Sequence, residues 1–162
     1  MCIRDSFKAH NYMRPMNLVG REGLSIDDAW SKGPRAYRTT AIPGFPNLFT
    51  VLGPNSPTAT ISLQYSSEVT ARYITRWLER FRSGEFETVE VTQEATDRFN
   101  DDVARALGPT VWNTGCNSWY ITDEGAIDLW PFDRATLTSQ LSEPDDRDFI
   151  VSSRALSGAR RT

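Results

Sequence analysis

The chain has 162 residues and a formal net charge of -3, with acidic and basic residues interleaved along most of its length. This balance predicts no nucleic-acid surface, because a basic stripe is absent. No apolar run reaches the roughly 18 residues that a membrane-spanning helix requires, and the N-terminal region lacks the apolar segment of a secretory signal. Two cysteines in dissimilar contexts, Cys2 and Cys116, give no disulfide framework. The composition therefore favours a cytoplasmic protein.

Residues 7–47 are rich in Gly, Pro and Arg, which indicates an ordered loop with brief strands near Met16–Val19 and Tyr37–Thr40. Ser25 is placed to cap one short helical turn that ends at Trp30. We expect Trp30 to anchor this loop on the main sheet, a structural role, rather than to contact a ligand.

A strand, a tight loop and a long helix are predicted next. Leu48–Leu52 is too short an apolar run for a helix and is typical of a buried strand, which Gly53-Pro54-Asn55 ends. The following helix, from about Ser62 to Arg82, carries apolar residues at a four-residue step, and Gly84 ends it. The residues of that apolar face are Val69, Tyr73, Trp77 and Phe81, with Ile74 and Leu78 beside them.

Alternating residues predict a half-buried strand over Phe86–Val91, after which Thr92 caps a second helix that ends at Gly108-Pro109. Residues 110–131 hold Trp112, Trp119 and Trp130 among turn residues, and these side chains either fill a small core or line a pocket. A short helix is expected from Phe132 to about Leu141. Residues 142–162 are polar enough to predict a disordered tail.

Few residues point to chemistry of their own. The only histidine, His10, and the two cysteines cannot assemble a metal site or a plausible serine triad. The acidic pairs Asp27-Asp28, Asp101-Asp102 and Asp145-Asp146 lie in charged, surface-like contexts. No G-x-G-x-x-G turn is present. The remaining candidate is a cofactor surface at residues 55–64, where hydroxyls and backbone N–H groups gather at a helix start that attracts negative charge.

Ordered blocks of Gly, aromatic and Pro residues run through the chain from about Phe7 to Leu137: Gly20-Arg21-Glu22-Gly23-Leu24, Trp30, Gly33-Pro34-Arg35-Ala36-Tyr37, Gly44–Pro57, Trp112, Cys116-Asn117-Ser118-Trp119-Tyr120 and Trp130-Pro131. Together they resemble the C-terminal part of the flavin-dependent Baeyer–Villiger monooxygenases and their flavin-containing monooxygenase relatives. The resemblance implies an α/β fold. Residues 7–91 would be the incomplete C-terminal part of a Rossmann-like FAD-binding domain, and 92–141 a small, loop-rich α+β extension.

The resemblance also implies cofactors and sites. FAD and NADPH would be the cofactors, and Asn55, Thr60, Ser62, Leu63 and Gln64 the FAD-side residues. Trp119 would lie on a mobile loop over NADP and substrate. The chain departs from the family pattern at two places. Ile61 cannot donate a side-chain hydrogen bond, which weakens its expected contact with flavin. The family's Gly-Ala-Asn-x-Pro-Gly-Lys is missing after Tyr120, which weakens the expected role of Trp119 in covering NADP. The catalytic arginine of the family, and so every catalytic residue, would lie upstream.

The resemblance leaves residues 1–6 unexplained, because the family has a buried strand leading into this region. We expect a foreign or artefactual start there, a genuine alternative start being the other interpretation. The chain alone is expected to be inactive.

Three functions stay open. The first is insertion of oxygen from O2 into a carbonyl compound through a flavin peroxide. The second is oxygenation of a nitrogen or sulfur atom with the same cofactors. The third is a non-catalytic binding domain, which would fold cooperatively without flavin, whereas a fragment would expose a strand edge and an apolar patch.

Overall fold

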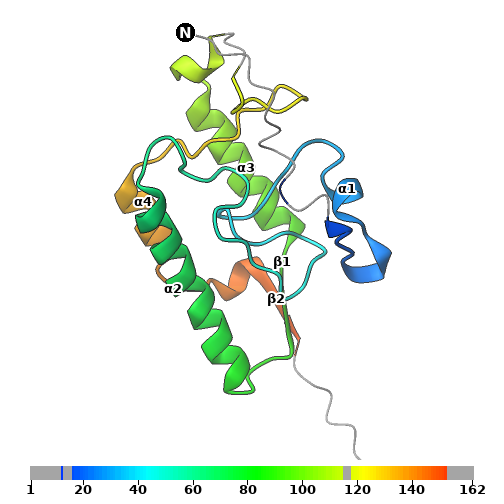
Figure 1. The fold of residues 1–162 in the computed structure, drawn as a ribbon. Helices are drawn as coiled ribbons and strands as arrows, with labels where there is room; N and C mark the ends of the chain where they lie inside the picture. The colour runs from blue at the N-terminus through cyan, green and yellow to red at the C-terminus, as the bar shows by residue number, and fades with distance from the viewer. Residues whose placement is uncertain (1–11, 13–15, 115–117, 153–162) are drawn as a thin grey trace, which may run out of the picture.

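The computed structural model describes Tyr12 and residues 16–114 and 118–152 (Figure 1). The expectations for residues 1–6, His10, Cys2 and Cys116 fall outside these residues. Two long helices, α2 (Leu63–Arg82) and α3 (Gln93–Leu107), flank a two-stranded sheet, and the loops of residues 36–62 cross in front of them in this view. The shorter elements are η3 (Arg21–Gly23), α1 (Ile26–Ala29), η4 (Val111–Asn113), α4 (Arg134–Gln140) and η5 (Asp146–Asp148).

Helix α2 confirms the predicted helix within one residue of its expected start. Its buried face consists of Ser66, Thr70, Tyr73 and Trp77, so it is rotated from the expected apolar stripe. Leu78 and Phe81, which the four-residue step assigned to the core, are 55% and 48% exposed. Gly84, at φ 80°, follows the helix as predicted, because its left-handed backbone lets the N–H of Glu85 donate to the carbonyl of Arg80.

The only strands within the described residues are β1 (Thr88–Val91) and β2 (Phe149–Ser152), which pair antiparallel with Val91 opposite Phe149. Strand β1 confirms the strand predicted at Phe86–Val91. Strand β2 corrects the disordered tail expected over 142–162: residues 142–152 are ordered, and Phe149 is buried at 6% exposure. Residues 153–162 lie outside the described chain.

Leu48–Leu52 does not form the predicted strand. Phe49 makes a single bridge to Ala41, and the backbone turns at Asn47 and Leu52, whose φ angles are 59° and 58°. A strand needs a ladder of backbone hydrogen bonds along its length, whereas among the described residues the one backbone bond from this segment to a neighbouring segment runs from the Thr50 N–H to the Thr40 carbonyl. The brief strands expected at Met16–Val19 and Tyr37–Thr40 are likewise reduced to isolated bridges.

Helix α3 and the short helices begin where the sequence places their caps. The Thr92 side chain accepts from the N–H of Ala95, and Ser25 caps α1 by accepting from the N–H of Asp28. Asp133 does the same for α4 through Thr136. Each cap satisfies a backbone donor that the helix itself leaves unpaired, and is typically worth about 1 kcal/mol.

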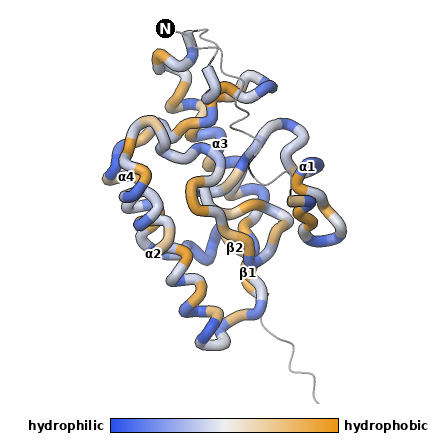
Figure 2. Tube along the Cα trace, viewed as in Figure 1, coloured by the Kyte–Doolittle hydropathy of each residue, from blue (hydrophilic) through white to orange (hydrophobic). Residues whose placement is uncertain are grey.

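Two apolar clusters hold the elements together. The larger cluster contains residues from all three regions that the sequence analysis distinguished, 7–91, 92–141 and 142–162. Its members include Tyr37, Trp77, Phe99, Leu129 and Phe149. Figure 2 shows hydrophobic and hydrophilic residues alternating along α2. The smaller cluster, of Ile26, Trp30, Ala36, Ile42 and Phe45, lies beneath the N-terminal loops. Trp30 is therefore structural, as expected, but it packs in this second cluster rather than on the sheet.

The buried tyrosines predict a loss of stability in alkali. Burial raises the pKa of Tyr73 to about 12 and also raises that of Tyr37, whose hydroxyl donates to Asp148. Because both folded pKa values exceed the usual value of about 10, the neutral phenols stabilise the fold fully below about pH 10, and this contribution is lost as the pH rises through the folded values. The free energy of unfolding, measured with urea at several pH values between about 8 and 11, should fall steadily above about pH 10. Tyr73→Phe should make that fall shallower, and an unchanged slope would contradict the assignment.

Candidate functional site

The loop of residues 53–57 is held by close contacts within the chain. A side chain at Gly53 would place Cβ 2.3 Å from Thr50 Oγ1 and 2.5 Å from the Thr39 carbonyl, so only glycine fits there. Asn55 has a left-handed φ of 61°, and the hydroxyl of Ser56 donates to the Gly53 carbonyl. The backbone at Gly53 therefore lies directly against Thr39 and Thr50.

The first turn of α2 presents unpaired backbone donors. Ser62 is the N-cap, but its hydroxyl donates to Gln64 Oε1, 2.9 Å away, and does not cap the helix. No hydrogen bond within the described chain reaches the N–H groups of Leu63, Gln64 or Tyr65. A 20-residue helix concentrates partial positive charge at such an end, which can hold an anion or an electron-rich oxygen or nitrogen.

A cavity of about 390 Å³ opens beside this turn. Arg134 stacks over the ring of Tyr65, with its guanidinium carbon 3.7 Å from the ring centroid, and the Tyr65 hydroxyl lies 2.6 Å from Thr138 Oγ1. The hydrogen bond with Thr138 and the nearby Arg134 lower the pKa of Tyr65. The stacked pair fixes the start of α4 against the start of α2. The cavity is lined by Thr60, Ile61, Ser62, Tyr65, Phe132, Asp133 and Arg134.

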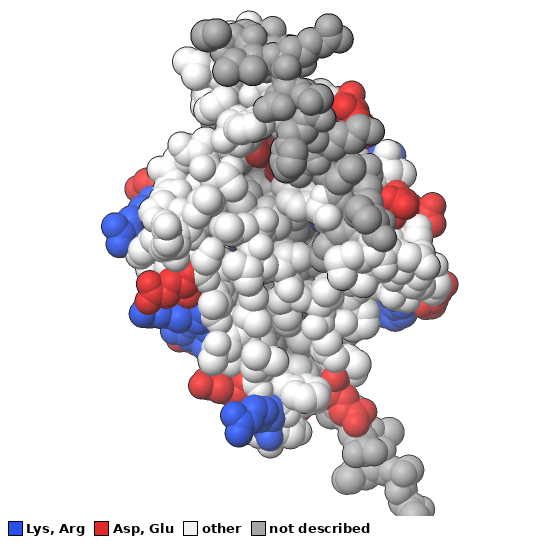
Figure 3. Space-filling model, in the orientation of Figure 1, with Lys and Arg blue, Asp and Glu red and all other residues white. Residues whose placement is uncertain are grey.

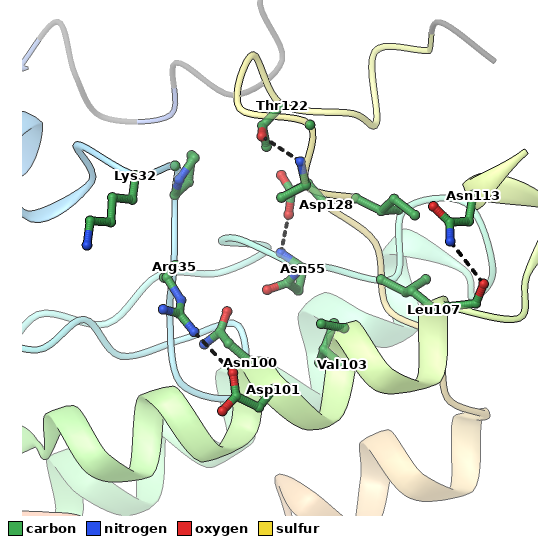
Figure 4. A pocket seen from close by; sticks show the side chains of 17 residues that line it. Lys32, Arg35, Asn55, Asn100, Asp101, Val103, Leu107, Asn113, Thr122 and Asp128 are labelled. Carbon is green, nitrogen blue, oxygen red and sulfur yellow. Dashed lines mark hydrogen bonds and ion pairs between the residues drawn. The ribbon is translucent and has the colours of Figure 1, made fainter. Parts of the chain in front are cut away.

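A second cavity, of about 310 Å³, lies between α3 and the loops around Gly33, Asn55 and Asp128 (Figure 4). Asp128 and Asn55 are 8% and 7% exposed, and the backbone N–H of Asn55 donates to Asp128 Oδ1 over 2.5 Å. The Asn55 side-chain oxygen is buried without a hydrogen-bond partner in the structure. At the rim, Arg35 pairs with Asp97 at 3.3 Å and with Asp101 at 3.9 Å.

The three tryptophans of residues 110–131 have different environments. Trp130 is buried at 1% exposure and packs on Phe99, so it belongs to the core. Trp112 is partly buried and meets Tyr120 edge to face at a centroid distance of 5.3 Å. Trp119 is 45% exposed and contacts the Tyr120 ring at 5.7 Å. Of the three, only Trp119 has the exposure that a ligand-covering side chain requires.

The structure groups some of the predicted site residues and separates others. Thr60 and Ser62 line the first cavity, and Leu63 and Gln64 are exposed on the adjoining helical turn. Asn55 lies in the second cavity, and Trp119 lines neither. Sequence reasoning missed Tyr65, Phe132 and Arg134. Tyr65 could have been found one turn after Ile61, but Arg134 carried no signal beyond its position at a helix start.

The described residues contain no cluster of three or more His, Cys, Asp or Glu side chains that could hold a metal ion. No helix among them is long and apolar enough to cross a membrane. The donors of the α2 turn suit one polar edge of a flavin ring. Nothing among the described residues forms a glycine-rich cradle for a pyrophosphate, so the fit is to the ring edge alone.

Comparison with known proteins identifies the relatives of the chain, although no family model matches it. A monooxygenase of Mycobacterium tuberculosis is 44% identical over 148 residues, which are 90% of this chain and 30% of that protein. A Baeyer–Villiger monooxygenase of Pseudomonas aeruginosa is 37% identical over 70% of the chain and 22% of its own length. An FAD-binding monooxygenase of Emericella nidulans is 29% identical over 88% of the chain and 24% of its own length.

Solved structures share the fold. The cyclohexanone monooxygenase mutant of Rhodococcus sp. Phi1 bound to NADP+ superposes with a TM-score of 0.80 at 25% identity, over 93% of this chain and 28% of the other. A complex of the enzyme OTEMO with FAD and NADP gives a TM-score of 0.79 at 20% identity, over 90% and 28%. The mixed helix and strand fold is thus that of one portion of these enzymes. The chain is similar in sequence and in fold to one portion of monooxygenases that include a Baeyer–Villiger enzyme, and it spans between 22% and 30% of the length of the three relatives named above.

Proposed function

We propose that this chain is the flavin-facing C-terminal segment of an FAD- and NADPH-dependent monooxygenase that inserts oxygen into a ketone or aldehyde. The observation that carries the proposal is the first turn of α2, where unpaired N–H groups open beside a 390 Å³ cavity at the residues the family resemblance assigns to FAD. The 37% identity to a Baeyer–Villiger monooxygenase favours a carbonyl substrate over a nitrogen or sulfur substrate.

The chain's own residues would bind and orient the ring. The N–H groups of Leu63 and Gln64 would donate to its electron-rich polar edge, an interaction worth about 0.3–1 kcal/mol when exposed and more when buried. Thr60 and Ser62 would add hydroxyl hydrogen bonds. Ile61 and Phe132, both partly buried at the cavity, would exclude water. When bound, FAD supplies the oxygen chemistry and NADPH its reducing equivalents.

Trp119 and Asn55 would act at other points of the site. Trp119, which is 45% exposed beside Tyr120, would cover the nicotinamide side of a substrate pocket. Asn55 would act through its loop rather than by direct contact, because it is 7% exposed and lies in the second cavity.

One face of the molecule has the character of a contact surface, which supports the proposal that the chain is part of a larger enzyme. Figure 3 shows charged residues at the margins of this view and an almost uncharged centre, over the loops of residues 36–62 and the side of α2. Val51 and Leu63, on that loop and helix, are 50% and 44% exposed. Such a surface suits contact with the remaining part of a flavin enzyme. The chain alone should neither hold FAD tightly nor oxidise NADPH, because its one-sided contact leaves the pyrophosphate unheld.

The test joins this chain to the part of the Mycobacterium tuberculosis relative that precedes the matching segment, and compares the joined protein with the chain alone. After gel filtration the joined protein should carry stoichiometric FAD and oxidise NADPH with O2, and the chain alone should do neither. Assays with a cyclic ketone and with a thioether separate the two substrate classes. Stoichiometric flavin on the chain alone, or a joined protein that folds without flavin, would overturn the proposal, and the second result would favour a binding domain.

Variants of the joined protein test the two sites. Gln64→Ala should change the rate of flavin reduction with the fold intact, whereas Gln93→Ala, at the exposed start of α3, serves as the matched control. Trp119→Ala should mainly raise the apparent KM for NADPH or release peroxide without product. Trp112→Ala, by contrast, should chiefly lower stability, since Trp112 packs against the core. If Trp119→Ala instead lowers the stability of the protein and leaves the yield of product per NADPH unchanged, the assignment of Trp119 to the cofactor loop is wrong.

A further inference from the structure

We propose that Asp128 is a positioning residue that fixes the loop carrying Trp119 relative to the loop that leads into the flavin-facing turn of α2. The inference rests on the proposed function, because the two loops are those assigned there to the nicotinamide and flavin sides of the site. We call them the Trp119 loop, residues 118–127, and the Asn55 loop, residues 53–57. They are more than 60 positions apart in the sequence.

Asp128 bonds both loops at once. Its backbone N–H donates to the carbonyl of Tyr120 over 2.7 Å, which closes the Trp119 loop at its base. Its carboxylate accepts from the backbone N–H of Asn55 over 2.5 Å. Figure 4 shows the second bond, with the Asp128 side chain pointing from the Trp119 loop toward the Asn55 loop across one side of the cavity. One residue therefore connects two segments that share no regular element.

The core fixes the position from which Asp128 acts. The next two residues, Leu129 and Trp130, are 0% and 1% exposed, so the backbone at Asp128 cannot shift without disturbing the packing. Asp128 as a whole residue is 8% exposed, so water competes little for its carboxylate oxygens. A charged acceptor bound to a buried N–H is stronger and more directional than a neutral one. Asp128 is thus a rigid reference point for the more exposed loops.

Only a few residues separate each hydrogen bond of Asp128 from the α2 turn or from Trp119. In the Asn55 loop, the carbonyl of Pro57 accepts from the N–H of Ile61 over 3.0 Å, and the unpaired donors of α2 follow at once. In the Trp119 loop, Tyr120 carries the carbonyl that Asp128 binds and the ring against which Trp119 packs at 5.7 Å. A change at Asp128 should therefore be felt both at the α2 turn and at Trp119.

A third contact provides an internal control. The hydroxyl of Tyr12 also donates to the Asp128 carboxylate, at Oδ2, whereas Asn55 uses Oδ1. Tyr12 packs edge to face on Trp30 at 5.7 Å, in the smaller cluster. Removing the Tyr12 hydroxyl should alter the surroundings of the carboxylate and leave its bonds to the two loops in place. Asp101, which lines the same cavity but pairs with Arg35, is a second control.

The decisive experiment is nuclear magnetic resonance of the isotope-labelled chain, comparing Asp128→Ala and Asp128→Asn with Asp101→Ala and Tyr12→Phe. In the parent the Asn55 amide should resonate downfield and exchange slowly with solvent. Asp128→Ala should abolish both properties, speed its exchange at least tenfold, and shift the amides of residues 60–64 and the Trp119 indole together. Asp128→Asn, which keeps an oxygen acceptor, should restore part of the protection. The two controls should leave both sets of signals in place.

Shifts confined to one loop in Asp128→Ala and Asp128→Asn, or equal shifts in Asp101→Ala, would overturn the proposal and leave Asp128 a local stabilising residue. If Asp128→Ala does not fold, Asp128→Asn decides by the same signals. In the joined protein Asp128→Asn should raise the apparent KM for NADPH and lower product per NADPH at unchanged FAD content, and normal values for both would also overturn it. The spectra do not depend on flavin, so a failure of the proposed function is told apart from a failure of this inference.

Discussion

Trp77→Ala is expected to lower the free energy of unfolding by about 3–5 kcal/mol, as truncation of a buried aromatic side chain does. Trp77 is 1% exposed, and its ring lies 4.6 Å from that of Phe149 and 5.8 Å from that of Phe86 by centroid distance. The indole therefore joins α2 to strand β2 and to the segment that leads into β1. Because domains are stable by only about 5–15 kcal/mol, much of the total would be lost. Urea denaturation followed by circular dichroism measures the change.

Two variants on the same helix sharpen this result. Leu78→Ala removes a side chain that is 55% exposed and should cost well under half as much. Trp77→Phe keeps an aromatic ring and removes an indole N–H that has no hydrogen-bond partner within the structure, so its cost should lie between the two. A Trp77→Ala loss no greater than that of Leu78→Ala would show that α2 is not packed as described.

Asp148→Ala should lower the free energy of unfolding by about 2–4 kcal/mol, because breaking a buried ion pair leaves its partners without compensation. Asp148 is 7% exposed and accepts from the hydroxyl of Tyr37 and from Arg98, and Arg38 lies 3.8 Å away. Arg98 is 55% exposed and can return to water, which keeps the loss below that of a fully buried pair. The same urea titration measures it.

Asp146→Ala is the matched control. Asp146 pairs with Arg80 through a carboxylate that is 63% exposed, and its removal should cost no more than about 1 kcal/mol. A double-mutant cycle with Tyr37→Phe should show a coupling of at least about 0.5 kcal/mol between Tyr37 and Asp148. Additive losses would mean that the hydrogen bond between these side chains contributes nothing to the fold.

The start of helix α2 was predictable from the sequence, but the rest of the cavity beside it was not. Turn residues followed by an amphipathic pattern place Ser62 at a helix start from local chemistry alone. Phe132 and Arg134 reach that turn from about 70 positions away, as the lining of the cavity shows. Asp128 gave no signal either, since an aspartate among other acidic residues looks solvated until the fold buries it.

The sequence by itself determined the elements whose hydrogen bonds close within a few residues. Helices α2 and α3, the Thr92 cap and the Gly84 turn follow from side-chain spacing and from backbone preferences that act over one helical turn. The resemblance of ordered motifs likewise pointed to the monooxygenases to which the chain is similar. Only the tertiary structure decided that Leu48–Leu52 makes a single bridge and that Phe149–Ser152 is a strand. Strand pairing joins residues as distant as Val91 and Phe149, and its stability depends on which buried surface, here the ring of Trp77, receives the side chains.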